Sequence, residues 1–461
     1  MNKLIGTWSF YKKIFYIAIP VMVQNLITNF VAMIDNIMVG QIGTEQMSGV
    51  AIVNQLFFVF NLTIFGATSG AGIFCAQFFG KKDMEGVRNT FRYKLITSFF
   101  ITALAIGVFL LLGDNLITVY LHDAKKGIDL AETFAYAKEY MLIMLVGLLP
   151  FSIENAYSST LREGAVAMPS MVAGIAAVVT NTFLNWVLIF GIGPFPVMGV
   201  CGAAIATVIS RFVQLGIVIV WTHTHSKELE YVKGLYKSLH VPAKIAKSVT
   251  SKGLLPLMAN ELLWSMGVAT LTQCYSMRGI DVVAGFNISN TVVNLFNVLF
   301  ISFGSGISVV MGQYLGANEL KEAKSAAPKM IFFSFVMCTV VGVVMACFAG
   351  IFPLAYNTIE EVRSLAKSFI FISAVFMPVH AMLNSSYFIM RSGGKTGITF
   401  LFDCGFSWLM SVPLAYSLVN FTDLNIVMVY FCVQAAEVIK CIVGLLLIKK
   451  GIWLSNIVAD K

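Results

Sequence analysis

The chain has 461 residues, of which 58% are hydrophobic and only 12% are charged, and its mean hydropathy is +0.83. Soluble globular chains carry about 25% charged residues, so the composition excludes a water-soluble globular protein and indicates an integral membrane protein. The net charge of +8 does not imply a nucleic-acid partner, because the lysines and arginines collect in connections on one side of the membrane. Their distribution predicts that both termini are cytoplasmic.

Long apolar runs of roughly 20 residues or more can each cross a bilayer as a helix. These runs are continuous rather than alternating, which favours helices over the strands of a membrane barrel. The twelve expected spans are residues 14–40, 46–79, 95–113, 136–161, 166–192, 199–222, 253–277, 282–316, 330–355, 368–390, 396–418 and 425–448. The sequence therefore predicts an all-α integral membrane fold with twelve transmembrane helices.

The first of these runs contains one charged residue, Asp35, and one proline, Pro20. An ionisable group at membrane depth is unfavourable and is usually retained for function, often for ion or proton handling. Pro20 removes a backbone donor inside the expected helix, so it predicts a structural kink. Asp35 therefore suggests a transporter.

An internal repeat organises the chain. An ungapped shift of 236 residues aligns Pro20 with Pro256, Met22 with Met258, Gly43 with Gly279, Gly49 with Gly285, Asn54 with Asn290, Gly70 with Gly306, Gln77 with Gln313 and Gly80 with Gly316. With smaller shifts, Arg162 aligns with Arg391, and Trp186 aligns with Trp408. Pro256 is thus a second predicted kink, and the matched glycines predict close helix packing.

The repeat predicts two pseudo-symmetric six-helix lobes. They comprise residues 1–225 and 250–461, and residues 226–249 form a cytoplasmic linker between them. Because each lobe has an even number of helices, both lobes have the same orientation across the membrane. Parallel repeats of this kind commonly bind substrate near mid-membrane and alternate access by rocking one lobe against the other.

Intramembrane acids are placed differently in the two halves of the repeat. The aligned pairs are Asp35 with Leu271, Glu261 with Asn25, and Asp403 with Asn181. Asp403 could approach either Glu261 or Lys440 in the folded chain. The acids are therefore expected to carry chemistry that is specific to one lobe.

Other intramembrane charges suggest ion pairs. Glu437 and Lys440 are spaced i, i+3 on the last expected helix, so they can pair on one face and lower each other's burial penalty. Glu154 and Arg211 could pair between the fourth and sixth helices. The sequence does not assign a role to any of these four residues or to Asp403.

The eight cysteines are scattered among apolar spans without CxxC spacing. They therefore indicate neither a metal centre nor a disulfide framework. No cofactor is predicted, and buried apolar packing is the expected role of the cysteines.

Five stretches carry a resemblance to a known family. They are Asp35–Gly40 (DNIMVG), Asn181–Gly191 (NTFLNWVLIFG), Gly202–Thr207 (GAAIAT), Asn260–Trp264 (NELLW) and Arg391–Thr396 (RSGGKT). With twelve expected helices in two bundles, the sequence resembles the multidrug and toxic compound extrusion (MATE) family over nearly its whole length.

The resemblance implies a secondary active multidrug exporter rather than an enzyme. Such a protein would antiport amphipathic, often cationic organic compounds against inward H⁺ or Na⁺ by alternating access. Its expected partners are these compounds and membrane lipids. The expected state is a monomer in the plasma membrane, specifically a bacterial inner membrane.

The resemblance also implies a coupling site in the first half of the chain. Asp35 matches the acid of the family's first helix, and Asn181, Asn185 and Thr207 match a polar cluster on its fifth and sixth helices. Na⁺ could bind near these four residues. Some relatives have an acid at the position of Asn185, and the amide here leaves Asp35 as the only carboxylate of the set.

A second set of coupling and substrate-binding candidates lies in the other half. Glu261 matches an acid of the family's seventh helix, and His380 stands where one branch has an acid in the tenth helix. Together with Asp35, these two residues are predicted to contact substrate. Carboxylates and an imidazole can exchange protons, so His380 and Glu261 could share a protonation network.

Two alternative functions are open. A lipid-linked saccharide flippase of the same broad superfamily would be expected to have more spans or a cationic cavity for a pyrophosphate. An integral membrane enzyme would be expected to carry paired aspartates on a helix or an HExxH zinc motif. The sequence favours the exporter because it has twelve expected spans and mainly acids in its apolar interior.

Overall fold

The computed structural model describes residues 4–121, 129–356 and 358–459, and the regular elements within these residues are all helices. Ten helical segments there are long and apolar enough to cross a membrane, and a bent pair of helices forms one further span. The first helix, of 33 residues, covers the remaining predicted span. The predicted all-α membrane fold of twelve transmembrane helices is thereby confirmed.

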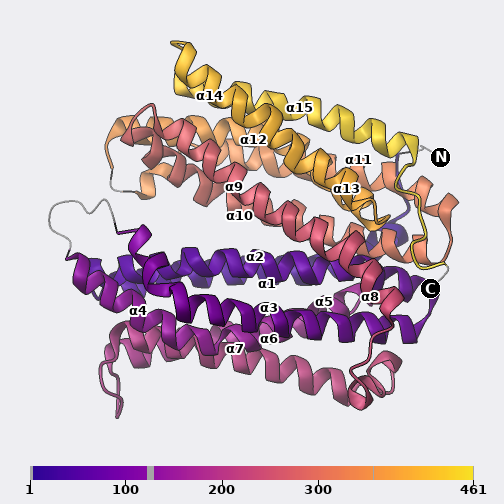
Figure 1. Ribbon diagram of the computed structural model, residues 1–461. Coiled ribbons are helices and arrows are strands. Elements are labelled where there is room, and N and C mark those ends of the chain that lie inside the picture. The colour runs from indigo at the N-terminus through magenta and orange to yellow at the C-terminus, as the bar shows by residue number, and fades with distance from the viewer. Residues whose placement is uncertain (1–3, 122–128, 357, 460–461) are drawn as a thin grey trace. The chain divides into compact units, whose positions relative to one another are not determined.

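The first half of the chain contains seven long helices followed by three short ones (Figure 1). Their bounds are α1 Trp8–Gly40, α2 Thr44–Lys81, α3 Met84–Val119, α4 Leu130–Val146, α5 Leu148–Glu163, α6 Met168–Phe190, α7 Gly199–Thr224, η1 Glu230–Val232, η2 Leu235–Lys237 and α8 Ala243–Val249.

The second half continues without a break from α8. Its elements are η3 Thr250–Leu254, α9 Leu255–Ser276, α10 Ile280–Gly316, α11 Leu320–Phe348, η4 Phe352–Ala355, α12 Glu360–Ser392, α13 Thr396–Phe400, η5 Leu401–Gly405, η6 Ser407–Ser411, α14 Val412–Phe421 and α15 Ile426–Lys450. Three of the short elements, η3, η5 and η6, are π-helical. Pro20 lies inside α1, and Pro256 is the second residue of α9, in its first turn.

Contacts divide the chain into two compact units. The N-terminal unit consists of Val23–Cys75 and Met84–Val249, and the C-terminal unit consists of Met1–Met22, Ala76–Asp83 and Thr250–Lys461. The start of α1 and the end of α2 therefore pack with the second half of the chain. The lobe and linker boundaries drawn from the repeat stay a prediction.

Aromatic and small residues attach the start of α1 to the C-terminal unit. The Tyr11 ring stacks on the Phe333 ring of α11, with their centroids 4.4 Å apart. Beside them, Gly306 of α10 packs against α1, since a Cβ at that glycine would lie 3.1 Å from the Ile14 carbonyl oxygen. Repeat glycines at this contact therefore serve close packing, as the sequence predicted.

The end of α2 crosses α10 at a reciprocal contact. A Cβ at Gly80 would overlap the carbonyl oxygen of Gln313, and a Cβ at Gly316 would overlap that of Gln77. These four residues form two aligned pairs of the sequence repeat. Each half thus supplies the same glycine and the same glutamine to one crossing, which is the arrangement that pseudo-two-fold symmetry produces.

The expected span 136–161 is not one continuous helix, and this prediction is corrected. It consists of α4 and α5, which are bent by 46°. Pro150 cannot donate a hydrogen bond to the carbonyl of Val146, so the backbone ladder is interrupted beside Gly147. Arg211 of α7 donates from Nη1 to the Gly147 carbonyl at 3.1 Å and so satisfies an acceptor at the break.

The span from Thr396 to Phe421 is locally widened. Its α-helical ends, α13 and α14, enclose the π-helical segments η5 and η6. Pro413 has no N–H for the carbonyl of Leu409, which disfavours regular α-helix in the turn before it. Asp403 lies in η5, and π-helical turns of this kind are frequent at functional sites.

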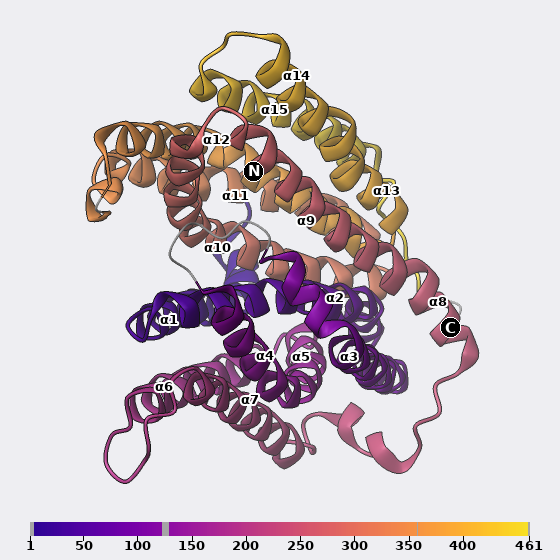
Figure 2. The same cartoon turned by 60° about the vertical axis from the view of Figure 1, so that its left-hand side comes forward.

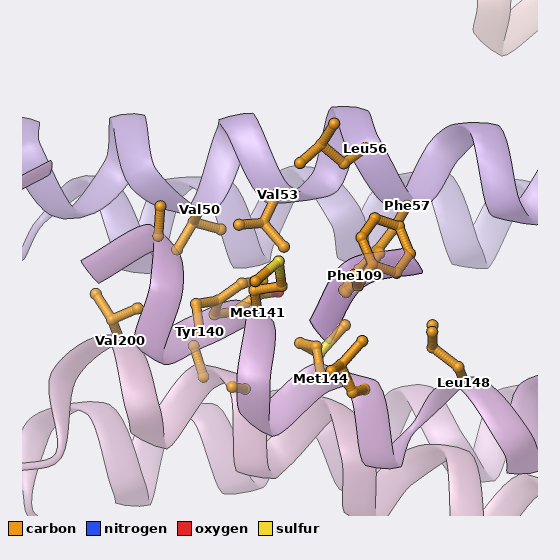
Figure 3. Packing of buried hydrophobic residues seen from close by; sticks show 14 of the residues in the cluster. Val50, Val53, Leu56, Phe57, Phe109, Tyr140, Met141, Met144, Leu148 and Val200 are labelled. Atoms are coloured by element: carbon orange, nitrogen blue, oxygen red, sulfur yellow. The ribbon is translucent and has the colours of Figure 1, made fainter. Parts of the chain in front are cut away.

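A large apolar cluster holds the N-terminal unit together. Phe57 of α2 and Phe109 of α3 meet edge to face, with ring centroids 5.1 Å apart. Figure 3 shows side chains from α2, α3, α4, α5 and α7 converging there, including Val50, Val53, Leu56, Tyr140, Met141, Met144, Leu148 and Val200. Burial of these residues fixes the positions of the helices around α7.

The connection after α7 is fastened to α3. Arg88 donates from Nε to the Tyr231 carbonyl at 3.1 Å, and Arg92 donates from Nε to the Leu235 carbonyl at 2.8 Å. Arg92 also donates from Nη2 to the carbonyl of Gly234 at 2.6 Å. Charge-assisted bonds to backbone carbonyls therefore order this segment.

Candidate functional site

Helices α1, α6 and α7 bring four polar side chains of the N-terminal unit together. Asn181 and Asn185 are four residues apart on α6 and so share one face. On α7, a Cβ at Gly202 would lie 2.7 Å from the Leu188 carbonyl oxygen, so only glycine permits this approach of α7 to α6. The two helices lie side by side in both views (Figures 1 and 2).

Hydrogen bonds connect Asp35, Asn181, Asn185 and Thr207, which we call the Asp35 cluster. Asn185 Nδ2 donates to Asp35 Oδ1 at 2.6 Å and to Asn181 Oδ1 at 3.3 Å. Asn181 Nδ2 donates to Thr207 Oγ1 at 3.2 Å, and Thr207 Oγ1 donates to the Ala203 carbonyl at 3.0 Å. One chain of hydrogen bonds therefore extends from α1 through α6 to α7.

The Asn181 amide fits this chain in a second orientation. When its oxygen and nitrogen are exchanged, Nδ2 lies 2.9 Å from Asp35 Oδ1 and 3.1 Å from Asp35 Oδ2, and the oxygen accepts from Thr207 Oγ1 at 3.2 Å. An ionised carboxylate accepts hydrogen bonds only, whereas a protonated one also donates. The exchanged orientation therefore suits ionised Asp35, and the first orientation suits the protonated acid.

The amides of Asn185 and Asn181 lie at hydrogen-bond distance from Asp35, and within the described ranges no lysine, arginine or histidine forms an ion pair with it. Asn181 is 5% exposed and Asn185 is 1% exposed. Asn185 Oδ1 is buried without a hydrogen-bond partner among the described residues. The cluster thus offers an uncompensated carboxylate and a spare oxygen ligand, which can accept a proton or a small hard cation.

A second polar cluster lies in the C-terminal unit, around Asp403 of η5. Lys440 Nζ of α15 donates to Asp403 Oδ1 at 2.9 Å and lies 3.7 Å from Glu437 Oε2. The Lys440 residue is 7% exposed. The predicted i, i+3 pair of Glu437 and Lys440 is confirmed. Asp403 had two suggested partners, Glu261 and Lys440, and it forms an ion pair with Lys440.

Asn260 and Tyr387 complete this group, which we call the Asp403–Lys440 cluster. Asn260 Nδ2 lies 3.2 Å from Asp403 Oδ2 and 3.3 Å from the Tyr387 hydroxyl oxygen. Sequence reasoning missed both residues. Asn260 directly precedes Glu261 in the motif on α9, and an intramembrane amide beside an acid was the available signal. Both oxygens of Asp403 are therefore hydrogen-bonded.

Glu261 points away from Asn260, because consecutive residues on a helix face different directions. It forms no hydrogen bond or ion pair with another residue in the described part of the chain, although the charges of Arg391 and Asp403 act on it. Arg391 is 4% exposed, and its guanidinium lies 5.8 Å from the centroid of the Tyr387 ring.

His380 lies on α12 and contacts α15. Its Nε2 is 2.9 Å from Gln434 Oε1, and the charges of Glu437 and Lys440 act on the ring. The described residues show no contact between His380 and Glu261. The structure therefore does not bring together the two members of the suggested protonation network, and the coupling roles of both residues stay predictions.

The suggested pair of Glu154 and Arg211 is wrong for this structure. Arg211 donates to the break between α4 and α5, and its guanidinium lies 5.0 Å from the centroid of the Phe151 ring. Glu154 instead accepts a hydrogen bond from Ser158, one turn along α5. The Gly147 carbonyl at the helix break accepts from the Phe151 N–H at 3.3 Å as well as from the guanidinium, because a carbonyl oxygen has two lone pairs.

A buried ion pair in the N-terminal unit was not foreseen. Lys94 of α3 pairs with Glu163 of α5, and its Nζ also donates to Ser159 Oγ at 2.9 Å and to Thr160 Oγ1 at 3.2 Å. The expected span 95–113 begins directly after Lys94, and the expected span 136–161 ends two residues before Glu163. Two opposite charges next to apolar runs were the signal.

Known proteins resemble this chain along nearly its whole length. The MatE family model matches residues 20–187 and 256–417. A Thermotoga maritima protein described as probable multidrug resistance protein NorM is 26% identical, and the match covers 96% of this chain and 93% of the relative.

Solved structures agree in fold. An outward-facing multidrug resistance MATE family transporter superimposes with a TM-score of 0.84 at 22% identity, covering 97% of this chain and 96% of the other. A mutant of the Vibrio cholerae MATE transporter VcmN gives a TM-score of 0.86 at 16% identity, covering 97% and 98%. The twelve-helix fold, the repeat and the family match converge, and this chain belongs to the MatE family of membrane transporters.

Proposed function

We propose that the protein exports amphipathic, often cationic organic compounds across the membrane in exchange for inward H⁺ or Na⁺. Relatives described as multidrug resistance proteins support the export of drug-like compounds. The observation that carries the coupling part is the Asp35 cluster, a carboxylate with hydrogen-bond partners but no ion-pair partner among the described residues. The expected location is a bacterial inner membrane with cytoplasmic termini.

The coupling step follows from the two orientations of the Asn181 amide. In the ionised state, Asn181 and Asn185 both donate to Asp35, and Thr207 donates to the Asn181 oxygen. Protonation of Asp35 reverses the Asn181 amide, which then accepts from the acid and donates to Thr207. The Thr207 proton turns to the carbonyl of Ala203. One proton on α1 thereby changes the hydrogen bonds of α6 and α7.

Sodium could replace the proton at the same place. Hard cations prefer carboxylate, amide, hydroxyl and carbonyl oxygens. The cluster supplies these through Asp35, Thr207 and the unpartnered Asn185 Oδ1. A single carboxylate suits a monovalent cation, because one bound charge neutralises it.

Charge neutralisation also links the ion to the substrate. An ionised Asp35 attracts a cationic compound, and a proton or Na⁺ on Asp35 removes that attraction. Glu261 would supply a second attractive charge in the C-terminal unit, with His380 as a further substrate contact. Reciprocal effects of ion and drug on each other's affinity follow from linkage.

The test is dye-cation efflux from proteoliposomes under H⁺ and Na⁺ gradients imposed separately. We expect one gradient to drive efflux in the unchanged protein and Asp35→Asn to abolish that stimulation. Asp114→Asn is the matched control, because Asp114 is an exposed acid paired with exposed Lys138 and such pairs contribute little. An efflux rate that does not change when either the H⁺ or the Na⁺ gradient is imposed would refute the antiport mechanism.

A further inference from the structure

A groove in the C-terminal unit lies apart from both polar clusters. It has a volume of about 520 Å³ and is formed by α11, α12, α15, the turn after α15 and Leu4, which precedes α1. We call it the α11–α15 groove. Its lining residues include Lys324, Ile331, Phe332, Phe335, Met382, Leu445, Lys449 and Trp453. Helix α12 packs against both α11 and α15, so Met382 lies at the floor between two walls.

The groove is apolar along most of its length and basic at one end. Lys324 lies in the second turn of α11, and Lys449 is the penultimate residue of α15. From Lys324 to Phe335 is eleven residues, or about 16 Å of helix. Half of the hydrocarbon core of a bilayer is about 15 Å thick. The length of the groove along α11 is therefore similar to the thickness of the hydrocarbon region of one membrane leaflet.

The two lysines are available to a ligand. Both are exposed, and neither pairs with a carboxylate in the part of the chain that the structure describes. Positive charge is thus concentrated where the helices end and the membrane surface begins.

Trp453 makes a rigid side of the groove at this end. It is 1% exposed, and its indole N–H already donates to the Ile448 carbonyl at 3.2 Å. Its ring is almost entirely covered by the protein, so it serves mainly to hold this end of the groove in place. Polar recognition is left to the lysines.

We propose that the α11–α15 groove binds an anionic phospholipid, with an acyl chain along α11 and the phosphate headgroup at Lys324 and Lys449. Basic pockets between transmembrane helices are typical sites for anionic headgroups. The apolar wall matches a chain that already lies in the same leaflet. Two lysines repel a cationic compound, so the groove is distinct from the proposed export pathway and does not depend on it.

The test measures the lipid retained by the full-length protein after purification in detergent, followed by titration with dioleoyl phosphatidylglycerol. Native mass spectrometry reports the bound lipid. Lys324→Gln combined with Lys449→Gln should lower the affinity about thirtyfold, because each lysine contributes about a factor of five at a membrane surface.

Lys321→Gln combined with Lys450→Gln is the matched control. These exposed neighbours carry the same charge on the same two helices but do not line the groove. The control pair should change the affinity less than threefold. Equal losses in both pairs would overturn the proposal, because they would reflect the general basic surface.

Two further ligands test the headgroup and the chain. Dioleoyl phosphatidylcholine should bind at least tenfold more weakly than phosphatidylglycerol, and equal binding would refute headgroup recognition. Glycerol phosphate, which has no acyl chains, should not displace the lipid. Displacement by it would show a simple phosphate site and would overturn the assignment of the apolar groove.

Discussion

The Asp35 cluster and the Asp403–Lys440 cluster both hold an acid inside a helical unit, and they stabilise it differently. Asp35 lies against the amides of Asn185 and Asn181, whereas Asp403 has Lys440 at 2.9 Å and Asn260 at 3.2 Å. The Lys440 ammonium group is covalently part of the chain and neutralises Asp403 permanently, whereas an exchangeable cation would neutralise a carboxylate only while it is bound. Of these two acids, Asp35 is the one without an ion-pair partner among the described residues, which fits the proposed exchange of H⁺ or Na⁺ at that cluster.

The difference coincides with the sequence repeat. Asp403 aligns with Asn181, so the same repeat position carries an acid in one half and a neutral amide in the other. In the half with the neutral amide, the acid stands on α1 and lacks a lysine partner among the described residues. One scaffold thus holds an acid without an ion-pair partner among the described residues in one unit and an ion-paired acid in the other.

The largest expected effect is that of Asp35→Asn on gradient-driven transport. The amide keeps an oxygen to accept from Asn185 but cannot cycle between charged and neutral forms. Gradient-driven efflux should fall to background, while exchange of labelled for unlabelled substrate without a gradient should continue. Folding should change by less than about 1 kcal/mol, because a partly buried charge is removed and not created.

Exchange and gradient-driven efflux can be measured in the same proteoliposomes. Loss of both activities would mean that Asp35 is needed for substrate binding alone. Retention of both would remove Asp35 from the coupling mechanism and would leave the contrast between the two clusters without a functional meaning.

Lys440→Met should have the largest effect on stability. It leaves the partly buried carboxylates of Asp403 and Glu437 without their cation, so the expected loss lies below the roughly 3–5 kcal/mol of breaking a fully buried pair. Adding Asp403→Asn should recover part of the loss, because one of the two stranded charges is then gone. Thermal unfolding in detergent measures both.

The Lys440 result separates a fixed ion pair from an exchangeable one. If Lys440→Met is as stable as the unchanged protein but now responds to Na⁺, then the C-terminal unit binds a cation once the tethered one is removed. Full stability without any ion would contradict the interpretation of this cluster as a structural ion pair.

Glu261→Gln is expected to have a smaller, selective effect. A charge-assisted contact contributes about 1.5–3 kcal/mol, so affinity for a permanently cationic dye should fall about tenfold or more. Affinity for a neutral compound of similar size should stay within about twofold. Binding of the two ligands by the purified protein distinguishes these outcomes, and equal weakening would assign Glu261 to structure.

His380→Gln should have the smallest effect. The glutamine can keep a hydrogen bond to Gln434, and the ring makes no contact with Glu261 in the described residues. Dye binding between about pH 5 and 8, where histidine ordinarily titrates, should therefore keep its profile. A markedly flatter profile in this variant would show that the C-terminal unit contributes proton coupling after all.

The helical architecture could be predicted because apolar length and glycine or proline positions are local properties of the sequence. Continuous runs of roughly 20 apolar residues permit little besides membrane helices, and the repeat identified Gly80 and Gly316 as a matched pair. In the structure each of these two glycines packs against the backbone of the other helix, as expected for equivalent positions of a repeat. The grouping of Asp35 with Asn181, Asn185 and Thr207 came from the resemblance to a family.

Only the tertiary structure decided which polar groups meet. Helical periodicity fixes the face on which Asn260, His380 or Arg211 lies, but not the helix that faces it. The packing of α9 against η5 brings Asn260 to Asp403, and the packing of α12 against α15 brings His380 to Gln434. At the break between α4 and α5, Arg211 donates to the carbonyl of Gly147. Partner choice depends on inter-helix distances of a few ångströms, because hydrogen bonds and ion pairs act only at contact.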